Sequence, residues 1–121
     1  MYEVTIRSHF DAAHFLRGYQ GKCENVHGHR WQVEITVRAK DTDVNGLAFD
    51  FRLLKEKLAP VLEELDHRLL NDQKPFDMIN PSSENIASYI YGKLKSSMDE
   101  NIELAMVKVY ESPDSWVAYY E

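Results

Sequence analysis

Strict alternation of apolar and polar residues predicts two long β-strands near the start of the chain. The clearest pattern covers residues 29–40. Its apolar face would consist of Trp31, Val33, Ile35, Val37 and Ala39. Residues 2–12 alternate as well, and they place Val4, Ile6 and Phe10 on one face. Because successive side chains of a strand point to opposite faces, each segment would turn one apolar face toward a core. The pattern is typical of half-buried antiparallel strands.

Apolar residues recur at helical spacing in two segments of the middle of the chain. Residues 50–65 carry leucines and a valine three or four positions apart, which predicts an amphipathic helix. Pro60 lies inside this segment, so we expect a kink or a break there. The second helix is expected to begin at Ser82 or Ser83, with Glu84 in its first turn. Its apolar stripe consists of Ile86, Tyr89, Ile90 and Leu94.

Two further strands are predicted over residues 104–111 and 116–120, with a turn at 112–114 between them. The resulting order β-β-α-α-β-β indicates one α+β domain over residues 1–121. Its core would be a four-stranded antiparallel sheet with two helices on one face. A sheet of this size leaves long exposed edges, which proteins usually cover or pair. We therefore expect the chain to form oligomers through its sheet edges.

The composition is that of an ordinary globular protein, with 44% hydrophobic and 28% charged residues. A formal net charge of −6 argues against nonspecific binding to nucleic acid, which requires a basic face. No apolar run is long enough to span a bilayer, and the first residues lack the pattern of a signal peptide. A single cysteine cannot form an intrachain disulfide, which fits a reducing compartment. We therefore expect a cytoplasmic protein with no nucleic-acid or membrane partner.

The segment Cys23–His29 carries the most specific chemical pattern in the chain. Side chains at positions i and i+2 of a strand share a face, so His27 and His29 could bind one metal ion together. Gly28 between them allows a close approach of the backbone. His14 follows the first strand and could supply a third ligand, which would leave the open fourth position of a catalytic zinc site. The alternative is that the three histidines are separate surface or core residues.

Three other groups could contribute chemistry. Cys23 has polar neighbours, and it is either a thiolate that acts as a base or a small buried side chain. Asp66 and His67 could belong to a proton relay, or they could simply be polar residues that close the first helix. Glu111 ends an otherwise apolar strand, so it is either exposed beyond the sheet or directed at a ligand. Its carboxylate could accept two N–H groups from an amidine-like ligand.

Six short motifs occur along the chain in an order that is more specific than any one of them. They are Phe10–His14, Cys23–His29, Asp50–Phe51, Leu65–Asn71, Asn80–Asn85 and Val109–Glu111. Together they span nearly the whole chain, which resembles the family of 6-pyruvoyl-tetrahydropterin and 6-carboxy-tetrahydropterin synthases. The resemblance implies the tunnelling fold, in which four-stranded sheets join edge to edge into an oligomeric barrel. It also implies a homohexamer, in which two trimers pair.

The resemblance assigns roles to residues in five of these six motifs. The residues implied to bind Zn²⁺ are His14, His27 and His29. The implied catalytic residues are Cys23 as the base, with Asp66 and His67 as its proton relay. The implied pterin-binding residues are Glu111, Ser82, Ser83 and Glu84, and the family often has threonine where this chain has serine. Family sites lie at subunit interfaces, so these residues need not meet within one chain.

The implied reaction is that of a zinc-dependent lyase acting on 7,8-dihydroneopterin triphosphate. Zinc would acidify the side-chain hydroxyls and the adjacent C–H, Cys23 would take that proton, and His67 would return one. Loss of triphosphate and cleavage of the side chain would then give 6-carboxy-5,6,7,8-tetrahydropterin and acetaldehyde, for 7-deazaguanine and queuosine synthesis. In the biopterin branch of the family the product is 6-pyruvoyl-tetrahydropterin.

Glu24 leaves a further product open. One branch of the family has glutamate three residues before His-Gly-His, often without the cysteine, and forms 6-hydroxymethyl-7,8-dihydropterin for folate synthesis. This chain has both Cys23 and Glu24, so Glu24 is either a second base or a solvated loop carboxylate. A non-enzymatic alternative is a domain that binds zinc or a pterin without turnover. The candidates for binding the triphosphate, which the sequence does not rank, are Lys22, Arg17, Arg30 and Arg68.

Overall fold

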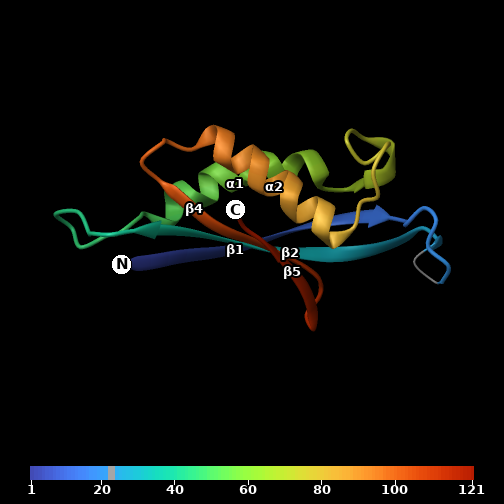
Figure 1. Ribbon diagram of the computed structural model, residues 1–121, viewed down its shortest axis with the longest axis horizontal. Helices are drawn as coiled ribbons and strands as arrows, with labels where there is room; N and C mark the ends of the chain where they lie inside the picture. The colour runs from blue at the N-terminus through green and yellow to red at the C-terminus, as the bar shows by residue number, and fades with distance from the viewer. Residues whose placement is uncertain (22–23) are drawn as a thin grey trace.

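In the computed structural model, the chain folds into one β-sheet with both helices packed on the same face (Figure 1). The structure describes residues 1–21 and 24–121. The strands are β1 (Tyr2–His14), β2 (His27–Ala39), β3 (Arg68–Leu69), β4 (Glu103–Ser112) and β5 (Ser115–Tyr119). The helices are α1 (Phe51–Leu65) and α2 (Ser83–Ser97), with a 3-10 turn, η2, over Leu70–Asp72. The predicted α+β class, with its helix pair between two pairs of strands, is confirmed.

The sheet has one strand more than the four that the sequence predicts. Its order is β3-β1-β2-β4-β5, and β3 pairs in parallel with residues 12–13 of β1. Two residues are too few to show alternation, so no pattern indicates this strand. It forms where the chain leaves α1 beside the end of β1, and there the His67 N–H donates to the Asp11 carbonyl oxygen over 2.6 Å.

The register of the two central strands decides which side chains share a face. β1 and β2 pair antiparallel along their whole length, from Tyr2 opposite Ala39 to His14 opposite His27. Even-numbered residues of β1 and odd-numbered residues of β2 therefore face the helices, which agrees with the predicted apolar faces. Phe10 and Trp31 are opposite one another in this register, and their rings stack with centroids 5.9 Å apart. On this same face, His14 ends β1, and His27 and His29 lie at the start of β2.

α1 is one helix through Pro60, so the predicted break is not present. Its buried residues are Leu54, Leu58, Val61, Leu62 and Leu65. Proline removes one backbone donor and leaves the carbonyl of Glu56 without its helical partner. Both Pro60 and Glu56 are exposed, so water can satisfy that carbonyl while the opposite, apolar side of the helix stays packed on the sheet. The Asp50 carboxylate caps the start of α1 by accepting from the Arg52 N–H over 2.8 Å.

The two outer edges of the sheet differ from its centre because little of the described chain covers them. β5 forms one edge, and β3 covers only residues 12–13 of β1 on the other. Such edges expose backbone donors and acceptors that another strand can pair with. The predicted oligomerisation through these edges stays a prediction, since the structure is of a single chain. No helix in the described ranges is long and apolar enough to cross a membrane.

Candidate metal centre and catalytic dyad

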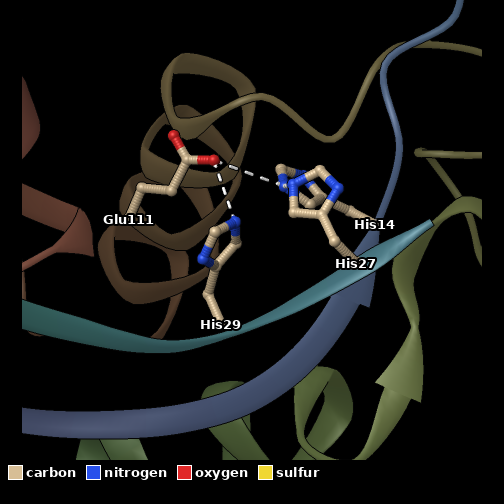
Figure 2. A group of neighbouring side chains, drawn as sticks. All are labelled: His14, His27, His29 and Glu111. Carbon is tan, nitrogen blue, oxygen red and sulfur yellow. Dashed lines mark hydrogen bonds and ion pairs between the residues drawn. The ribbon is translucent and has the colours of Figure 1, made fainter. Parts of the chain in front are cut away.

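Three histidines converge where β1 ends and β2 begins. His14 is the last residue of β1, and His27 and His29 lie in the first three residues of β2, all on the face that carries the core. Figure 2 shows their rings turned toward one another, with the Glu111 carboxylate from β4 above them. The Nε2 atoms of His14 and His27 are 3.0 Å apart. The predicted three-histidine group is therefore assembled within one chain.

Backbone carbonyls fix which nitrogen of two of these rings carries the proton. The Nδ1 atom of His14 lies 2.7 Å from the Pro81 carbonyl oxygen, and that of His27 lies 2.6 Å from the Asn25 carbonyl oxygen. A carbonyl oxygen only accepts, so each Nδ1 must donate, and each neutral ring then has a lone pair at Nε2. Two lone pairs facing one another at 3.0 Å repel unless a cation or a proton lies between them. Carbonyl support of this kind is usual for histidines that bind metals.

His29 and Glu111 complete a donor set that suits a metal ion. The Nε2 atom of His29 is buried and makes no well-aligned hydrogen bond within the described residues, although it closely approaches the Glu111 carboxylate. It lies 3.0 Å from Glu111 Oε1, which is also 3.5 Å from His14 Nε2. The candidate ligand atoms of all four residues lie within 4.8 Å of one another. A buried nitrogen without a well-aligned hydrogen bond, within a group of convergent donors, fits a metal-binding site.

Burial keeps two of these imidazoles, His14 and His29, in the form that binds metals. His14 is 1% exposed, and this desolvation lowers its pKa below the usual value, with the neighbouring His27 and His29 adding to the effect. Burial also lowers the pKa of His29, although the Glu111 carboxylate acts in the opposite direction. A lowered pKa means that the rings are neutral at pH 7, and only a neutral imidazole offers a lone pair to a metal.

Trp31 packs against two rings of the histidine cluster, a role that its place in the alternating pattern does not reveal. Its ring meets those of His14 and His29 edge to face, with centroids 4.8 and 5.2 Å away. The indole N–H donates to the Ala12 carbonyl oxygen over 3.2 Å, so the fully buried ring cannot turn. The two histidine rings therefore rest on a fixed aromatic surface.

The start of α2 lies directly behind the cluster. Ser82 caps the helix by accepting from the Asn85 N–H over 3.2 Å, as predicted, and Pro81 before it accepts from His14. Ser83 and Glu84 follow in the first turn. The structure thus brings Ser82 and Ser83, two of the four predicted pterin-binding residues, next to the segment that holds His14, while Glu84 is exposed.

Asp66 and His67 form a second group, here called the dyad, which is separate from the histidine cluster. The Asp66 Oδ2 atom lies 2.9 Å from His67 Nδ1, and its Oδ1 atom accepts from the Asp11 N–H over 2.8 Å. These hydrogen bonds lower the pKa of the Asp66 carboxyl. His67 has a φ of 57°, a left-handed conformation that is uncommon for a residue with a side chain and often marks a functional site. The predicted pair is thus in hydrogen-bonding contact.

Comparisons with known proteins show which family this arrangement belongs to. The family model for 6-pyruvoyl tetrahydropterin synthase matches residues 3–121. The chain belongs to the 6-pyruvoyl tetrahydropterin synthase family. A 6-carboxy-5,6,7,8-tetrahydropterin synthase of Rickettsia felis is 32% identical over 136 residues, covering 97% of this chain and 99% of the relative. The enzyme of that name from Bacillus subtilis is 35% identical over 126 residues, covering 98% of this chain and 84% of the relative.

Solved structures agree with this assignment. The 6-pyruvoyl tetrahydropterin synthase of Caenorhabditis elegans superimposes with a TM-score of 0.87 and 32% sequence identity, covering 100% of this chain and 97% of the other. The predicted family and the predicted α+β fold of a single subunit are thereby confirmed.

Two of the predicted catalytic residues, Cys23 and Glu24, belong to the segment of the sequence between β1 and β2. Cys23, the predicted base, lies outside the described residues. Glu24 is exposed, and its backbone N–H donates to the Gly21 carbonyl oxygen over 3.2 Å. Glu24 belongs to neither group of candidate ligands, so its predicted role as a second base stays a prediction.

The structure separates three of the four basic candidates that the sequence left equal, and the fourth, Lys22, lies outside the described residues. Arg17 is structural, because its guanidinium donates to the carbonyl oxygens of Phe76 and Asn71 over 2.9 and 3.2 Å. Arg30 is paired with Asp11. Arg68 lines an open hollow of about 490 Å³ together with His67 and His29. Among the described candidates, Arg68 is therefore best placed to meet an anionic group beside the dyad.

Proposed function

We propose that this synthase-family chain is a 6-carboxy-5,6,7,8-tetrahydropterin synthase. It would convert 7,8-dihydroneopterin triphosphate and one water molecule to 6-carboxy-5,6,7,8-tetrahydropterin, with release of acetaldehyde and triphosphate. The observation that carries the proposal is the convergence of three imidazole Nε2 atoms in a chain whose relatives in Rickettsia felis and Bacillus subtilis bear that name. The product would enter 7-deazaguanine and queuosine synthesis. The single cysteine fits a reducing compartment, so we propose a cytoplasmic location.

His14, His27 and His29 would hold Zn²⁺, because three neutral imidazoles with one further position are a common donor set for catalytic zinc. When bound, zinc would act as a Lewis acid that lowers the pKa of the substrate's side-chain hydroxyls and of the neighbouring C–H. The protein's own contribution is to aim the three Nε2 atoms at one point and to hold the ring proton on Nδ1. The carbonyls of Pro81 and Asn25 do this for two of the rings.

Glu111 would anchor the pterin ring. Its carboxylate, 35% exposed, is one wall of a hollow of about 380 Å³ that His29 also lines. Two carboxylate oxygens match the adjacent amino group and ring N–H of a pterin, a bidentate arrangement. Anchored there, the ring would direct its side chain toward the histidines. Ser82, Ser83 and Glu84 would line the other side of the pterin pocket from the start of α2.

Proton transfer would fall to Cys23 and His67. Cys23 would remove the proton from the side-chain carbon as a thiolate, which nearby cationic groups favour. Asp66 holds the proton of His67 on Nδ1, so Nε2 is the atom that can receive a proton and return it elsewhere on the skeleton. Loss of triphosphate and cleavage of the side chain would follow these transfers.

The two groups of residues would meet in an oligomer. Within one chain the dyad and the histidines form two separate groups, and the dyad lies at the β3 side of the sheet. Pairing of a β1 edge with a β5 edge of a second copy would extend the sheet into a barrel. We propose a homohexamer, a dimer of trimers, in which the dyad of one copy faces the metal centre of another.

The test is a product assay. The purified, zinc-loaded protein is incubated with 7,8-dihydroneopterin triphosphate, and the pterins are identified by mass. We expect 6-carboxy-tetrahydropterin, with loss of product in Cys23→Ala and little change in Glu24→Ala. A protein that binds zinc and a pterin but yields no product would overturn the proposal in favour of a binding domain.

A second candidate product is 6-pyruvoyl-tetrahydropterin, which the likeness to the Caenorhabditis elegans synthase favours. The same assay separates the two, because only the carboxy product is accompanied by acetaldehyde. Appearance of 6-hydroxymethyl-7,8-dihydropterin that depends on Glu24 would instead assign the chain to folate synthesis, alone or beside the main reaction.

A further inference from the structure

Two asparagine side chains, here called the asparagine pair, continue the pairing of β1 beyond its last residue. β3 pairs with residues 12–13 of β1, and the chain then leaves the sheet. The Phe15 N–H donates to Asn71 Oδ1, and Asn71 Nδ2 donates to the Phe15 carbonyl oxygen, each over 2.9 Å. Arg17 and Asn80 form the same two bonds over 2.8 and 3.0 Å. Because a primary amide has both donors and an acceptor, each asparagine replaces a strand partner.

The asparagine pair connects the chain beyond His14 with the loop that orients the His14 ring. His14 is the last residue of β1, and the segment that the asparagine pair binds follows it directly. The Pro81 carbonyl oxygen, which accepts from His14 Nδ1 over 2.7 Å, belongs to the residue after Asn80. Asn80 therefore binds the chain that follows His14 and also lies next to the carbonyl group that orients the imidazole.

Side-chain bonds must fix this loop, because residues 73–82 lie outside the helices and strands. Asn71 precedes the loop and is 4% exposed, and its carbonyl oxygen accepts from the Arg17 guanidinium over 3.2 Å. At the other end, Asn85 of α2 donates from Nδ2 to the Asn80 carbonyl oxygen over 2.8 Å. Buried backbone groups are costly to leave unpaired, so loss of either asparagine should displace the loop or the segment that it binds.

We propose that Asn71 and Asn80 are positioning residues of the metal centre. They hold the His14 imidazole in place by fixing both the chain that follows it and the loop that supplies the Pro81 carbonyl. The inference rests on the proposed function for the use of His14 as a metal ligand, whereas the bond between His14 and Pro81 can be measured without metal. Residues that support a metal ligand in this way usually change metal affinity about 10- to 100-fold when they are replaced.

Replacement of each asparagine by aspartate tests the proposal with almost no change of shape. The carboxylate still accepts from the backbone N–H, but it cannot donate to the carbonyl oxygen, which then faces a negative charge. We expect Asn71→Asp and Asn80→Asp each to lower metal affinity about 10- to 100-fold. Asn80 is half-buried, so Asn80→Asp decides the question if Asn71→Asp, at the more buried position, does not fold.

The experiment measures Zn²⁺ affinity by competition with a chelator and the visible spectrum of the protein loaded with Co²⁺, which reports coordination geometry. Asn101→Asp, in an exposed turn, is the control for the added negative charge. Leu104→Ala is the control for lost stability, because this core residue lies at the end of β4 away from Glu111. Unfolding by denaturant ranks the stability of all four variants.

Lower affinity and an altered Co²⁺ spectrum in both asparagine variants, with neither change in the two controls, would support the inference. Affinity at the wild-type value in Asn71→Asp and Asn80→Asp would overturn it. An equal loss of affinity in Leu104→Ala would also overturn it, because the asparagine pair would then act only through the stability of the fold.

Failure of the proposed function has a different signature. NMR of the ¹⁵N-labelled, metal-free protein reports the Nδ1–H proton of His14 and its rate of exchange with water. We expect faster exchange in both asparagine variants than in the wild type and in Asn101→Asp. If the wild type binds no Zn²⁺, the proposed metal centre is wrong, and this exchange rate still decides whether the asparagine pair positions His14. An unchanged rate in both asparagine variants would overturn the inference whether or not the wild type forms a pterin product.

Discussion

The candidate metal centre and the Asp66–His67 dyad differ in burial and in their position in the sheet. The three histidines lie on the core face of two fully paired central strands, and His14 is 1% exposed. The dyad lies at the margin of the sheet beside a two-residue strand, and the side chain of His67 is 78% exposed. Packing on Trp31 and carbonyl bonds fix the first group, whereas backbone bonds from Asp11 fix the second.

This difference indicates which part of the site a single chain can complete. A metal site needs converging, desolvated donors, and the histidines already have both properties. A group that transfers protons to a carbon skeleton works best where water is excluded, and the open hollow around His67 does not exclude it. We therefore expect metal binding to survive in an isolated subunit and catalysis to require the assembled oligomer.

Loss of one metal ligand should have the largest effect. His27→Ala removes one of three imidazoles, so we expect metal affinity to fall by about 100-fold or more and product formation to be lost. Competition with a chelator measures the affinity. His9→Ala is the matched control, because His9 lies on the opposite, polar face of β1 and should leave metal binding unchanged. Equal affinity in His27→Ala and the wild type would remove His27 from the metal centre.

A change in the dyad should abolish turnover without touching the metal. Asp66→Asn places an amide group against His67 Nδ1 in place of the acceptor that holds its proton. We expect kcat to fall about 10²- to 10⁴-fold, the usual contribution of general acid–base catalysis. Metal content should stay at the wild-type value. Asp77→Asn, in an exposed loop, is the control for the loss of one negative charge.

If Asp66→Asn instead lowered the metal affinity, the two regions would be coupled. Coupling that persists in an isolated subunit would point to a path through β1, which carries both Asp11 and His14, and coupling only in the oligomer would point to contact across a subunit interface.

Glu111 is the residue that the comparison leaves between two roles. The structure puts its Oε1 atom 3.0 Å from His29 Nε2, while the family resemblance gives it to the pterin. We expect Glu111→Gln to raise KM by about 10- to 100-fold, the effect of losing a hydrogen bond to a charged group, and to retain the metal. Glu103→Gln, at the far end of β4, serves as the control. A loss of metal affinity as large as that of His27→Ala would make Glu111 a ligand.

Much of the metal centre follows from the sequence, because strand geometry is local. Alternation placed His27 and His29 on one face, and the antiparallel return of the chain brought His14 beside them. The Asp66–His67 pair was also predictable, since adjacent residues need no long-range information. The Asp11–Arg30 pair was not, because its two side chains are 19 residues apart and meet only through the register of β1 and β2.

The proximity of Glu111 to the histidines lay beyond the sequence for a similar reason. β4 follows both helices in the sequence but pairs with β2 in the sheet. Which end of β4 reaches His29 therefore depends on a register between strands that are far apart in the chain. The break expected at Pro60 fails because burial of the leucine stripe outweighs one lost hydrogen bond on the exposed side of α1.

The smallest effect concerns Ser82, which connects the start of α2 with the metal centre. Its hydroxyl accepts from the Asn85 N–H, and the preceding Pro81 carbonyl holds His14 Nδ1. Ser82→Ala should lower the free energy of unfolding by about 1 kcal/mol, the usual cost of losing a helix cap. Thermal denaturation measures this, with the exposed mid-helix Ser88→Ala as the control.

Because the Pro81 carbonyl and its neighbours stay in place, the metal affinity of Ser82→Ala should change far less than that of His27→Ala. A large loss of affinity would show that the cap, and not packing on Trp31 alone, fixes the ring of His14.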